Sequence, residues 1–375
     1  MNASAEGRGR SSEPEEPISR PGPGLLHREL GAWYARNRRD LPWRRTRDPY
    51  AIWVSEVMLQ QTTVRVATPY YEGFLRRFPT VSDLGAAGEE QVIAAWSGLG
   101  YYHRARNLRR GAAHVVERHR GRFPRSLEAA LAVPGVGLYT ASAVLSIAYG
   151  LPFPVVDGNV RRVLARLLAL RGARWRRDGP FYDLAEELLD RAAPGEWNQA
   201  LMELGATVCT PRKPACPACP LRAHCRGRRL GIADTLPEGK AARPPVDVTV
   251  AAALVEAGDR LLLVRRAEGR LLGRMWEVPQ TSLEARGLAD LARELEERHG
   301  LRVVPGPLVV RARHAITFRR IRLEGYRTRL RRPAPADPER FRWASLEEAA
   351  LLPTSSMTRK LLRGLRSAQL PLALE

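Results

Sequence analysis

All four cysteines of this chain lie within a segment of seventeen residues: Cys209, Cys216, Cys219 and Cys225. The spacing, C-x6-C-x2-C-x5-C, lets four thiolates surround one tetrahedral metal ion or one iron–sulfur cluster, which forces the segment to fold back on itself. Zinc ribbons usually contain two C-x2-C pairs, whereas this run contains one, so the spacing favours one 4Fe–4S cluster over zinc. Zinc and buried free thiols are the alternatives.

The charge of the chain indicates the chemistry of its partner. Its 375 residues are enough for two or three domains with their own cores. The net charge of +21 and the pI of about 10.9 predict a polyanion such as nucleic acid. Arginine carries nearly all of this charge, since Lys213, Lys240 and Lys360 are the only lysines, and genomic base composition can also produce such a skew.

No long uncharged apolar stretch occurs in the chain, so we predict no membrane span and no membrane partner. Residues 1–24 are polar and rich in Pro and Gly, which predicts a disordered tail. Clustered thiols fit a reducing compartment. We therefore expect a monomer in the bacterial cytoplasm, associated with the nucleoid.

The chain divides into a helical part and a mixed part. Residues 25–228 predict an all-α domain that ends in the cysteine loop 209–225, because apolar residues recur at helical spacing between short Pro/Gly breaks. The helical runs are Ala51–Gln61, Glu89–Ser97, Asn107–Arg118, Ser126–Ala132, Tyr139–Ala148 and Asn159–Leu170.

Residues 229–246 contain Pro and Gly clusters and predict a linker. Residues 247–370 then predict a smaller α+β domain. Its strands are expected at Val248–Glu256, Arg260–Arg266, Leu308–Arg313 and Ile321–Thr328, with a hairpin turn at 257–259 and a helix at Leu288–His299.

The segment Pro134-Gly135-Val136-Gly137 separates two predicted helices and predicts a tight hairpin. The following helix presents its first amide groups and the positive end of its dipole, which suits a nucleic-acid phosphate. An ordinary glycine-rich helix connection is the alternative, because short glycine motifs are weak signals.

Two carboxyl groups are candidates for acid and base chemistry. Asp157 directly precedes a predicted helix, where the dipole would keep it ionised, and a plain helix N-cap is the alternative. Glu56 lies among Trp53, Val57 and Met58, and a carboxyl group in an apolar shell keeps its proton more readily. One protonated and one ionised carboxyl group is the pair that breaks glycosidic bonds, although a solvated Glu56 remains the alternative.

Several segments together resemble the helix-hairpin-helix DNA glycosylase superfamily, and specifically its adenine DNA glycosylase (MutY) family, over about residues 30–330. The most specific is the string Glu-Val-Met-Leu-Gln-Gln-Thr. The segments are 41–43 (LPW), 55–62 (SEVMLQQT), 98–102 (GLGYY), 134–137 (PGVG), 156–163 (VDGNVRRV) and the cysteine run. The hairpin and cysteines alone would equally suit endonuclease III enzymes acting on oxidised pyrimidines, or a DNA-binding module without catalysis.

The resemblance implies a base excision repair enzyme that hydrolyses the N-glycosidic bond of adenine opposite 8-oxoguanine or guanine in double-stranded DNA. Glu56 would protonate adenine N7 and later activate water. Asp157, positioned by Tyr139 and Asn159, would stabilise the cationic sugar or bond to it transiently. The implied adenine pocket comprises Arg39, Leu41 and Trp43. The implied DNA contacts include Gly135, Val136 and Gly137 of the hairpin. They also include Gln61, Thr62, Leu99 and Tyr101, which would approach or wedge into the base stack beside the opposite base.

The absence of lysine before residue 213 argues for a monofunctional glycosylase. Strand cleavage through a Schiff base requires an amine nucleophile, and Tyr139 stands where the bifunctional relatives carry lysine. We therefore expect an abasic-site product.

The second domain resembles the Nudix-like domain that reads 8-oxoguanine in this family. A working Nudix hydrolase is the alternative, but Arg298 and Ala285 stand where two acidic residues of its box belong. Family members usually carry Phe-Ser-His in the lesion-reading turn, where this chain has Ile316-Thr317-Phe318. Thr317 keeps a hydroxyl for the lesion, Phe318 could stack, and His314 is expected to be a plain strand residue.

Overall fold

The computed structural model describes residues 22–238, 243–267, 273–283, 287–316 and 318–369. Contacts divide these residues into two compact units, of which the first combines the chain up to Arg39 with Gly150–Glu238. The second combines Asp40–Tyr149 with the described residues that follow Glu238. The predicted boundaries at residues 228 and 246 stay a prediction. No described helix is long and apolar enough to cross a membrane.

The first unit is helical throughout its described residues. Helix α11 packs against both α1 and α9 around one apolar core that includes Leu30, Val163 and Leu201. Because α1 starts at Pro23, the last two residues predicted for the tail are helical. The elements are α1 (Pro23–Asn37), α9 (Gly158–Leu167), α10 (Gly179–Glu187), α11 (Pro194–Thr207), α12 (Arg226–Arg229) and the short 3-10 turns η2 (Ala173–Arg176), η3 (Cys216–Ala218) and η4 (Ala233–Thr235).

The second unit begins with helices, in agreement with the predicted runs. Asp48 caps α2 by accepting hydrogen bonds from the amides of Tyr50 and Ala51, and Pro49 supplies the first helical residue. Helix α2 packs on α8. The elements are η1 (Pro42–Arg44), α2 (Pro49–Leu59), α3 (Val64–Arg77), α4 (Val81–Ala86), α5 (Glu89–Trp96), α6 (His103–His119), α7 (Leu127–Leu131) and α8 (Leu138–Tyr149).

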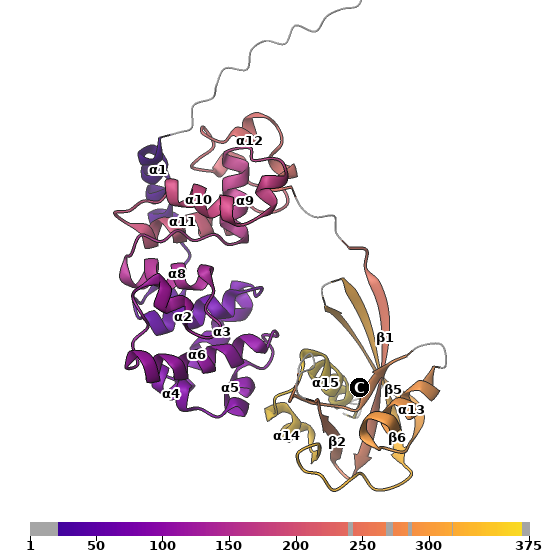
Figure 1. Ribbon diagram of the computed structural model, residues 1–375. Helices are drawn as coiled ribbons and strands as arrows, with labels where there is room; N and C mark the ends of the chain where they lie inside the picture. The colour runs from indigo at the N-terminus through magenta and orange to yellow at the C-terminus, as the bar shows by residue number, and fades with distance from the viewer. Residues whose placement is uncertain (1–21, 239–242, 268–272, 284–286, 317, 370–375) are drawn as a thin grey trace, which may run out of the picture. The chain divides into compact units, whose positions relative to one another are not determined.

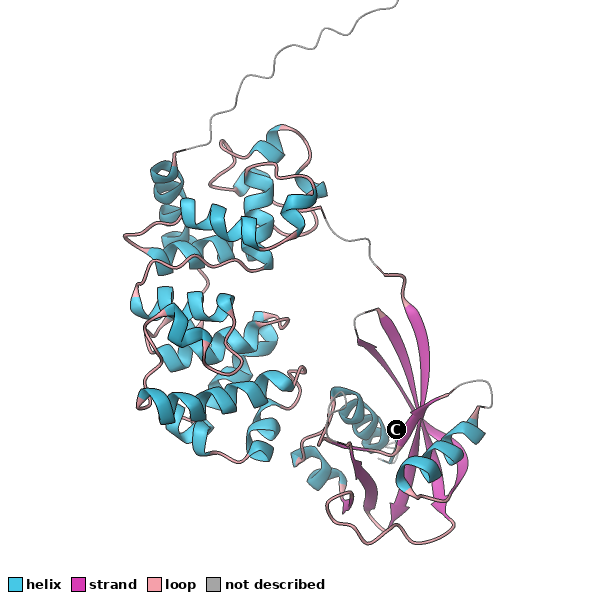
Figure 2. Cartoon of the chain, in the orientation of Figure 1, coloured by secondary structure: helices cyan, strands magenta, loops and turns pink. Residues whose placement is uncertain are grey.

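The chain after the linker forms the predicted α+β domain around a mixed sheet, whose strands appear as magenta arrows in Figure 2. The central strand β1 pairs in parallel with β6 and antiparallel with β2. The elements are β1 (Val246–Ala257), β2 (Arg260–Arg265), β3 (Trp276–Glu277), β4 (Gln280–Ser282), α13 (Leu288–His299), β5 (Val303–Ile316), β6 (Arg319–Leu330), β7 (Phe341–Ala344), α14 (Leu346–Leu351) and α15 (Ser356–Gln369).

Both faces of β1 are buried, which explains its nearly unbroken apolar sequence. Ala252 and Leu254 pack with Leu361 of α15, whereas Ala253 and Val255 pack with the apolar face of α13 on the opposite side. The four predicted strands and the predicted helix are therefore confirmed, with β5 and β6 extending further than the sequence pattern indicated.

Candidate active site

Glu56 lies on α2 and is almost fully buried, with 5% of its surface exposed. The hydroxyl of Tyr139, in the first turn of α8, donates a hydrogen bond of 2.5 Å to Oε2 of Glu56. The alternative of a solvated helix-face acid is wrong. The sequence predicted Tyr139 to position Asp157, whereas this hydrogen bond gives Tyr139 a role in orienting Glu56.

Asp157 is the N-cap of α9: its Oδ1 accepts a 2.7 Å hydrogen bond from the amide of Val160. Its other oxygen, Oδ2, accepts a hydrogen bond of 2.8 Å from Nδ2 of Asn159. The cap that the sequence offered as an alternative is therefore real, and it fixes the carboxylate in one orientation. Asn159 contacts this carboxylate, as predicted.

Burial raises the pKa of Asp157, although the hydrogen bonds from Val160 and Asn159 and the charge of Arg162 lower it. The sequence predicted only the favourable effect of the helix start. Desolvation is the larger effect, because a partly buried carboxylate loses water that two hydrogen bonds do not fully replace.

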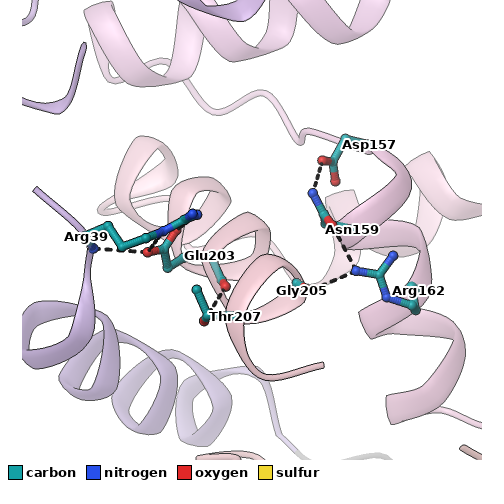
Figure 3. Close-up of polar contacts among 7 residues, drawn as sticks. All are labelled: Arg39, Asp157, Asn159, Arg162, Glu203, Gly205 and Thr207. Atoms are coloured by element: carbon teal, nitrogen blue, oxygen red, sulfur yellow. Dashed lines mark hydrogen bonds and ion pairs between the residues drawn. The ribbon is translucent and has the colours of Figure 1, made fainter. Parts of the chain in front are cut away.

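Arg162 connects Asn159 to the cysteine segment. Its Nη2 donates 2.8 Å hydrogen bonds to Oδ1 of Asn159 and to the carbonyl of Gly205 (Figure 3). Its Nε donates 2.7 Å to the carbonyl of Cys209. A continuous chain of hydrogen bonds therefore runs from Asp157 through Asn159 and Arg162 to the first cysteine.

Arg39 of the predicted adenine pocket is held by a residue that sequence reasoning missed. Glu203 on α11 is buried and accepts from Nε of Arg39 at 2.8 Å, from Nη2 at 2.7 Å and from its backbone amide at 3.0 Å. In Figure 3, Glu203 contacts Arg39, and Gly205 of the same helix contacts Arg162. Helix α11 therefore carries both contacts, and the sequence signal for Glu203 was an acidic residue between the apolar residues Met202 and Leu204.

The other two predicted pocket residues, Leu41 and Trp43, are both buried beside η1. The indole of Trp43 packs edge to face on Tyr71, with ring centroids 5.3 Å apart. Both side chains are therefore largely covered by the protein.

The predicted hairpin joins α7 to α8. Gly135 has a φ of +81°, and a Cβ there would lie 2.5 Å from Cβ of Asn107, so no other residue fits. Val136 is buried, whereas Gly135 and Gly137 are exposed. Any contact with a phosphate at this hairpin therefore uses the backbone rather than the side chain of Val136.

Two loops carry the remaining DNA-contact candidates, and each contains a non-glycine residue with left-handed backbone. Gln61 has a φ of +58° and Tyr101 a φ of +48°, a conformation that costs energy and often marks functional loops. Tyr101 is exposed, Thr62 is half-buried, and Leu99 is buried. Tyr101 is therefore the side chain that this loop presents to solvent, and Leu99 supports the loop from inside. Insertion of Tyr101 into DNA stays a prediction.

Arg104, which the sequence analysis did not single out, ties these two loops together. Its Nη1 donates to the carbonyls of Val57 at 2.8 Å and of Gln60, while its Nη2 donates to the carbonyl of Gly100 at 3.2 Å. It is almost fully buried, and this desolvation lowers its pKa to about 10.

Replacing Arg104 with Met should lower the free energy of unfolding by about 2 to 4 kcal/mol, because several buried carbonyls lose their donor. Urea unfolding measures this change. Arg110→Met, at an exposed position of the same helix α6, is the control and should change the free energy of unfolding little. Equal stabilities of the two variants would contradict the role of Arg104.

The four cysteines line one cavity of about 30 Å³ together with Arg166, Arg222 and Arg228. No three of the described His, Cys, Asp and Glu side chains converge closely enough to hold a single metal ion. Four thiols around one cavity are the donor set that a zinc ion or an iron–sulfur cluster requires. Burial raises the pKa of Cys219 to about 12, so that ligand must lose its proton on binding.

Arg166, another residue that the sequence did not reveal, closes the cysteine segment. The side chain is fully buried and donates to the carbonyls of Thr210 at 2.7 Å, Pro211 at 3.0 Å and Leu236 at 2.9 Å. It also lies 3.4 Å from Sγ of Cys209, where a guanidinium would stabilise a thiolate.

In the second domain, β5 and β6 form a hairpin whose turn is the predicted lesion-reading segment. Thr317 lies outside the described residues. Phe318 is half-buried, with the guanidinium groups of Arg243 and Arg319 at 5.6 and 5.8 Å from its ring centroid. His314 is a strand residue of β5, as predicted.

The Nudix box forms helix α13, but its chemistry is altered. Arg298 is paired with Glu294, so a guanidinium already neutralises one of the box carboxylates. Ala285 lies outside the described residues. This pairing is consistent with the expectation that the domain is not a metal-dependent hydrolase.

Two family models match the chain. Residues 54–178 match the HhH-GPD superfamily of base excision DNA repair proteins. Residues 250–364 match the NUDIX domain. The first match covers Glu56, Tyr139 and Asp157, and the second covers most of the α+β domain.

The chain is similar to curated adenine DNA glycosylases along most of its length. It is 36% identical to the human enzyme, over 89% of this chain and 72% of that protein. It is 45% identical to the enzyme of Mycolicibacterium smegmatis, over 57% of this chain and 72% of that protein. Among solved structures, a thermostable thymine-DNA glycosylase superposes with a TM-score of 0.51 at 30% identity, covering 56% of this chain and 97% of that one.

Proposed function

This chain belongs to the adenine DNA glycosylase family, and on that basis we propose that it releases adenine by hydrolysis alone, from duplexes with adenine opposite 8-oxoguanine or guanine. Excision of mispaired adenine in base excision repair is the activity common to its relatives, and this chain is an N-glycosylase of that kind.

Glu56 is the general acid of the proposed mechanism. Its buried position and the 2.5 Å hydrogen bond from Tyr139 support delivery of a proton to N7 of adenine, which makes the base a better leaving group. After the base departs, the resulting carboxylate is suited to take a proton from the attacking water. The Tyr139–Glu56 hydrogen bond is the observation that carries this assignment.

Asp157 is the electrostatic stabiliser. Its two oxygens are fixed by Val160 and Asn159, so it opposes the positive charge that develops on the sugar without reorganising. Tyr139 offers no amine, and the first lysine of the chain is Lys213. These features support a monofunctional reaction that leaves an abasic site. Arg39, Leu41 and Trp43 would hold the extruded adenine.

The cysteines are proposed to hold one 4Fe–4S cluster, which would cross-link the segment after α11 and supply structural rigidity. Purified protein should be yellow-brown, with a broad visible absorption band and about four irons per chain. Iron and zinc analysis by mass spectrometry measures this. A colourless, active protein with one zinc per chain would contradict the cluster.

The α+β domain is proposed to read 8-oxoguanine, through the turn that contains Thr317 and Phe318. Deleting the residues after Arg243 should leave some adenine excision and remove most of the preference for 8-oxoguanine over guanine. The experiment compares single-turnover excision on duplexes with adenine opposite 8-oxoguanine, adenine opposite guanine, and thymine glycol, followed by alkali.

Activity on thymine glycol instead of adenine would support the endonuclease III alternative. An unchanged preference in the truncated protein would show that the α+β domain is not the lesion reader. We expect the full-length protein to retain a preference for 8-oxoguanine, reduced by a loss of about 1 kcal/mol for the missing histidine hydrogen bond.

A further inference from the structure

The loop between α5 and α6, residues 97–102, is held from behind by the α+β domain. Nη1 of Arg359, on α15, donates a 2.7 Å hydrogen bond to the carbonyl of Ser97. The carbonyl of Thr354 accepts 3.0 Å from the hydroxyl of Tyr102 and 3.3 Å from the hydroxyl of Ser97. All these groups belong to one compact unit.

These contacts are buried and connected to the sheet of the second domain. Thr354, Ser97 and Tyr102 are each at most 3% exposed. Thr354 forms a parallel bridge with Trp276 of β3, whose amide donates 2.9 Å to the carbonyl of Pro353. The path from the sheet to the loop is therefore made of short, desolvated hydrogen bonds, which resist displacement more than exposed ones.

The loop has little freedom at the point where it is held. Gly98 has a φ of +115°, and a Cβ there would lie 2.0 Å from the hydroxyl of Tyr70 and 3.5 Å from Arg359. The hydroxyl of Tyr102 also accepts 3.2 Å from the amide of Gly98. The backbone between Ser97 and Tyr102 is thus fixed, and exposed Tyr101 lies directly within this span.

Ion pairs add to the same contact region. Arg265 of β2 pairs with Glu90 of α5 at 2.6 Å, and Arg106 of α6 donates to the carbonyl of Gly273. Since Arg106 also pairs with Glu89 at 3.0 Å, both helices that flank the loop are attached to the α+β domain.

We propose that Arg359 and Thr354 of the α+β domain position the Tyr101 loop for insertion into DNA, so that this domain assists base extrusion irrespective of the opposing base. A wedge that enters the base stack must bear the cost of unstacking, which requires a rigid support. Arg359 is a positioning residue, since it acts through the carbonyl of Ser97. The inference rests on the proposed function, because it concerns the step that precedes adenine excision.

The test measures base extrusion separately from chemistry. Duplexes carry 2-aminopurine beside the mispaired adenine, opposite either guanine or 8-oxoguanine, and stopped-flow fluorescence follows unstacking by the full-length protein. Arg359→Ala should slow extrusion about tenfold on both duplexes, which is the effect of one lost charged hydrogen bond. Arg359→Lys should recover part of the rate, because it keeps a donor for Ser97. Arg363→Ala, exposed on the same helix, is the matched control and should behave as wild type.

Tyr102→Phe provides a second test that keeps the packing. It removes the hydroxyl that contacts Thr354 and Gly98, and should slow extrusion about threefold on both duplexes. A protein with both substitutions should be slowed by less than the product of the two separate effects, because both residues act on one loop. If Arg359→Ala fails to fold, the extrusion rate of Tyr102→Phe tests the proposal.

Wild-type extrusion in these variants would overturn the proposal, and so would a loss confined to the 8-oxoguanine duplex, which would assign Arg359 to lesion reading. Failure of the proposed function has a different signature. In that case the wild-type protein excises adenine from neither duplex. Slowed extrusion by Arg359→Ala would then still show that Arg359 positions the Tyr101 loop.

Discussion

Glu56→Gln should slow single-turnover excision of adenine by about a thousandfold, because the amide cannot donate the proton that the departing base needs. The substitution is nearly isosteric. The amide oxygen of Gln can still accept the hydrogen bond that Tyr139 donates to Glu56, so the fold and duplex binding should change little. Single-turnover kinetics and a binding titration with the same mispaired duplex separate the two effects.

Glu117→Gln is the matched control for this prediction. Glu117 lies exposed on α6, and its replacement makes the same acid-to-amide change without touching α2. Excision by Glu56→Gln within a few-fold of this control would refute the assignment of Glu56 as general acid.

Asp157→Asn should slow excision by about a hundredfold to a thousandfold, because it removes the negative charge that opposes the developing cation. Asn is as good an N-cap as Asp, so α9 should keep its start and the amide of Val160 its acceptor. Asp183→Asn, exposed on α10, is the control of equal charge change. Normal excision by Asp157→Asn would mean that the stabilising charge comes from elsewhere.

The stability of Asp157→Asn should move in the opposite direction from its activity. Because burial raises the pKa of Asp157 above that of the unfolded chain, the folded protein holds this proton more tightly. The resulting stabilisation is full at low pH and is lost as the pH rises through the raised pKa. At neutral pH the ionised carboxylate therefore destabilises the fold, and the Asn variant should melt at the same temperature or higher.

The same pKa determines the acid limb of the pH profile. Activity needs ionised Asp157, so the excision rate should fall as the pH falls through a pKa above the ordinary value for Asp. Asn159→Ala removes a hydrogen bond that lowers this pKa and should move the acid limb to higher pH. An unmoved limb would show that another group controls it.

Local patterns in the sequence predicted part of the secondary structure and drew attention to the candidate residues. Helices α3 and α11 and strand β7 were not predicted. The alternation of apolar residues predicted α2, α8, β1 and β6, since a helix or strand buries a face of fixed periodicity. Asp157 and Asn159 were predicted to act together, and they are neighbours because only one residue separates them in the chain. The cysteine spacing predicted a shared site, and all four thiols line one cavity.

Contacts between residues distant in sequence were not predictable in this way. The hydrogen bond from Tyr139 to Glu56 was not predicted, because the sequence does not tell that α8 packs on α2. Glu203, Arg104 and Arg166 appeared to be ordinary polar residues of amphipathic helices. Their roles follow from burial, which forces each to find partners in other segments.

The sequence by itself therefore determined the family, the order of the two domains, the reaction type and the residues that carry charge or sulfur at short spacing. Only the tertiary structure decided which group orients Glu56, how far burial opposes the ionisation of Asp157, and what supports the Tyr101 loop. The physical reason is the same in all three cases. A hydrogen bond or a desolvation cost depends on atoms that the fold brings together, and residues such as Ser97 and Arg359 are far apart along the chain.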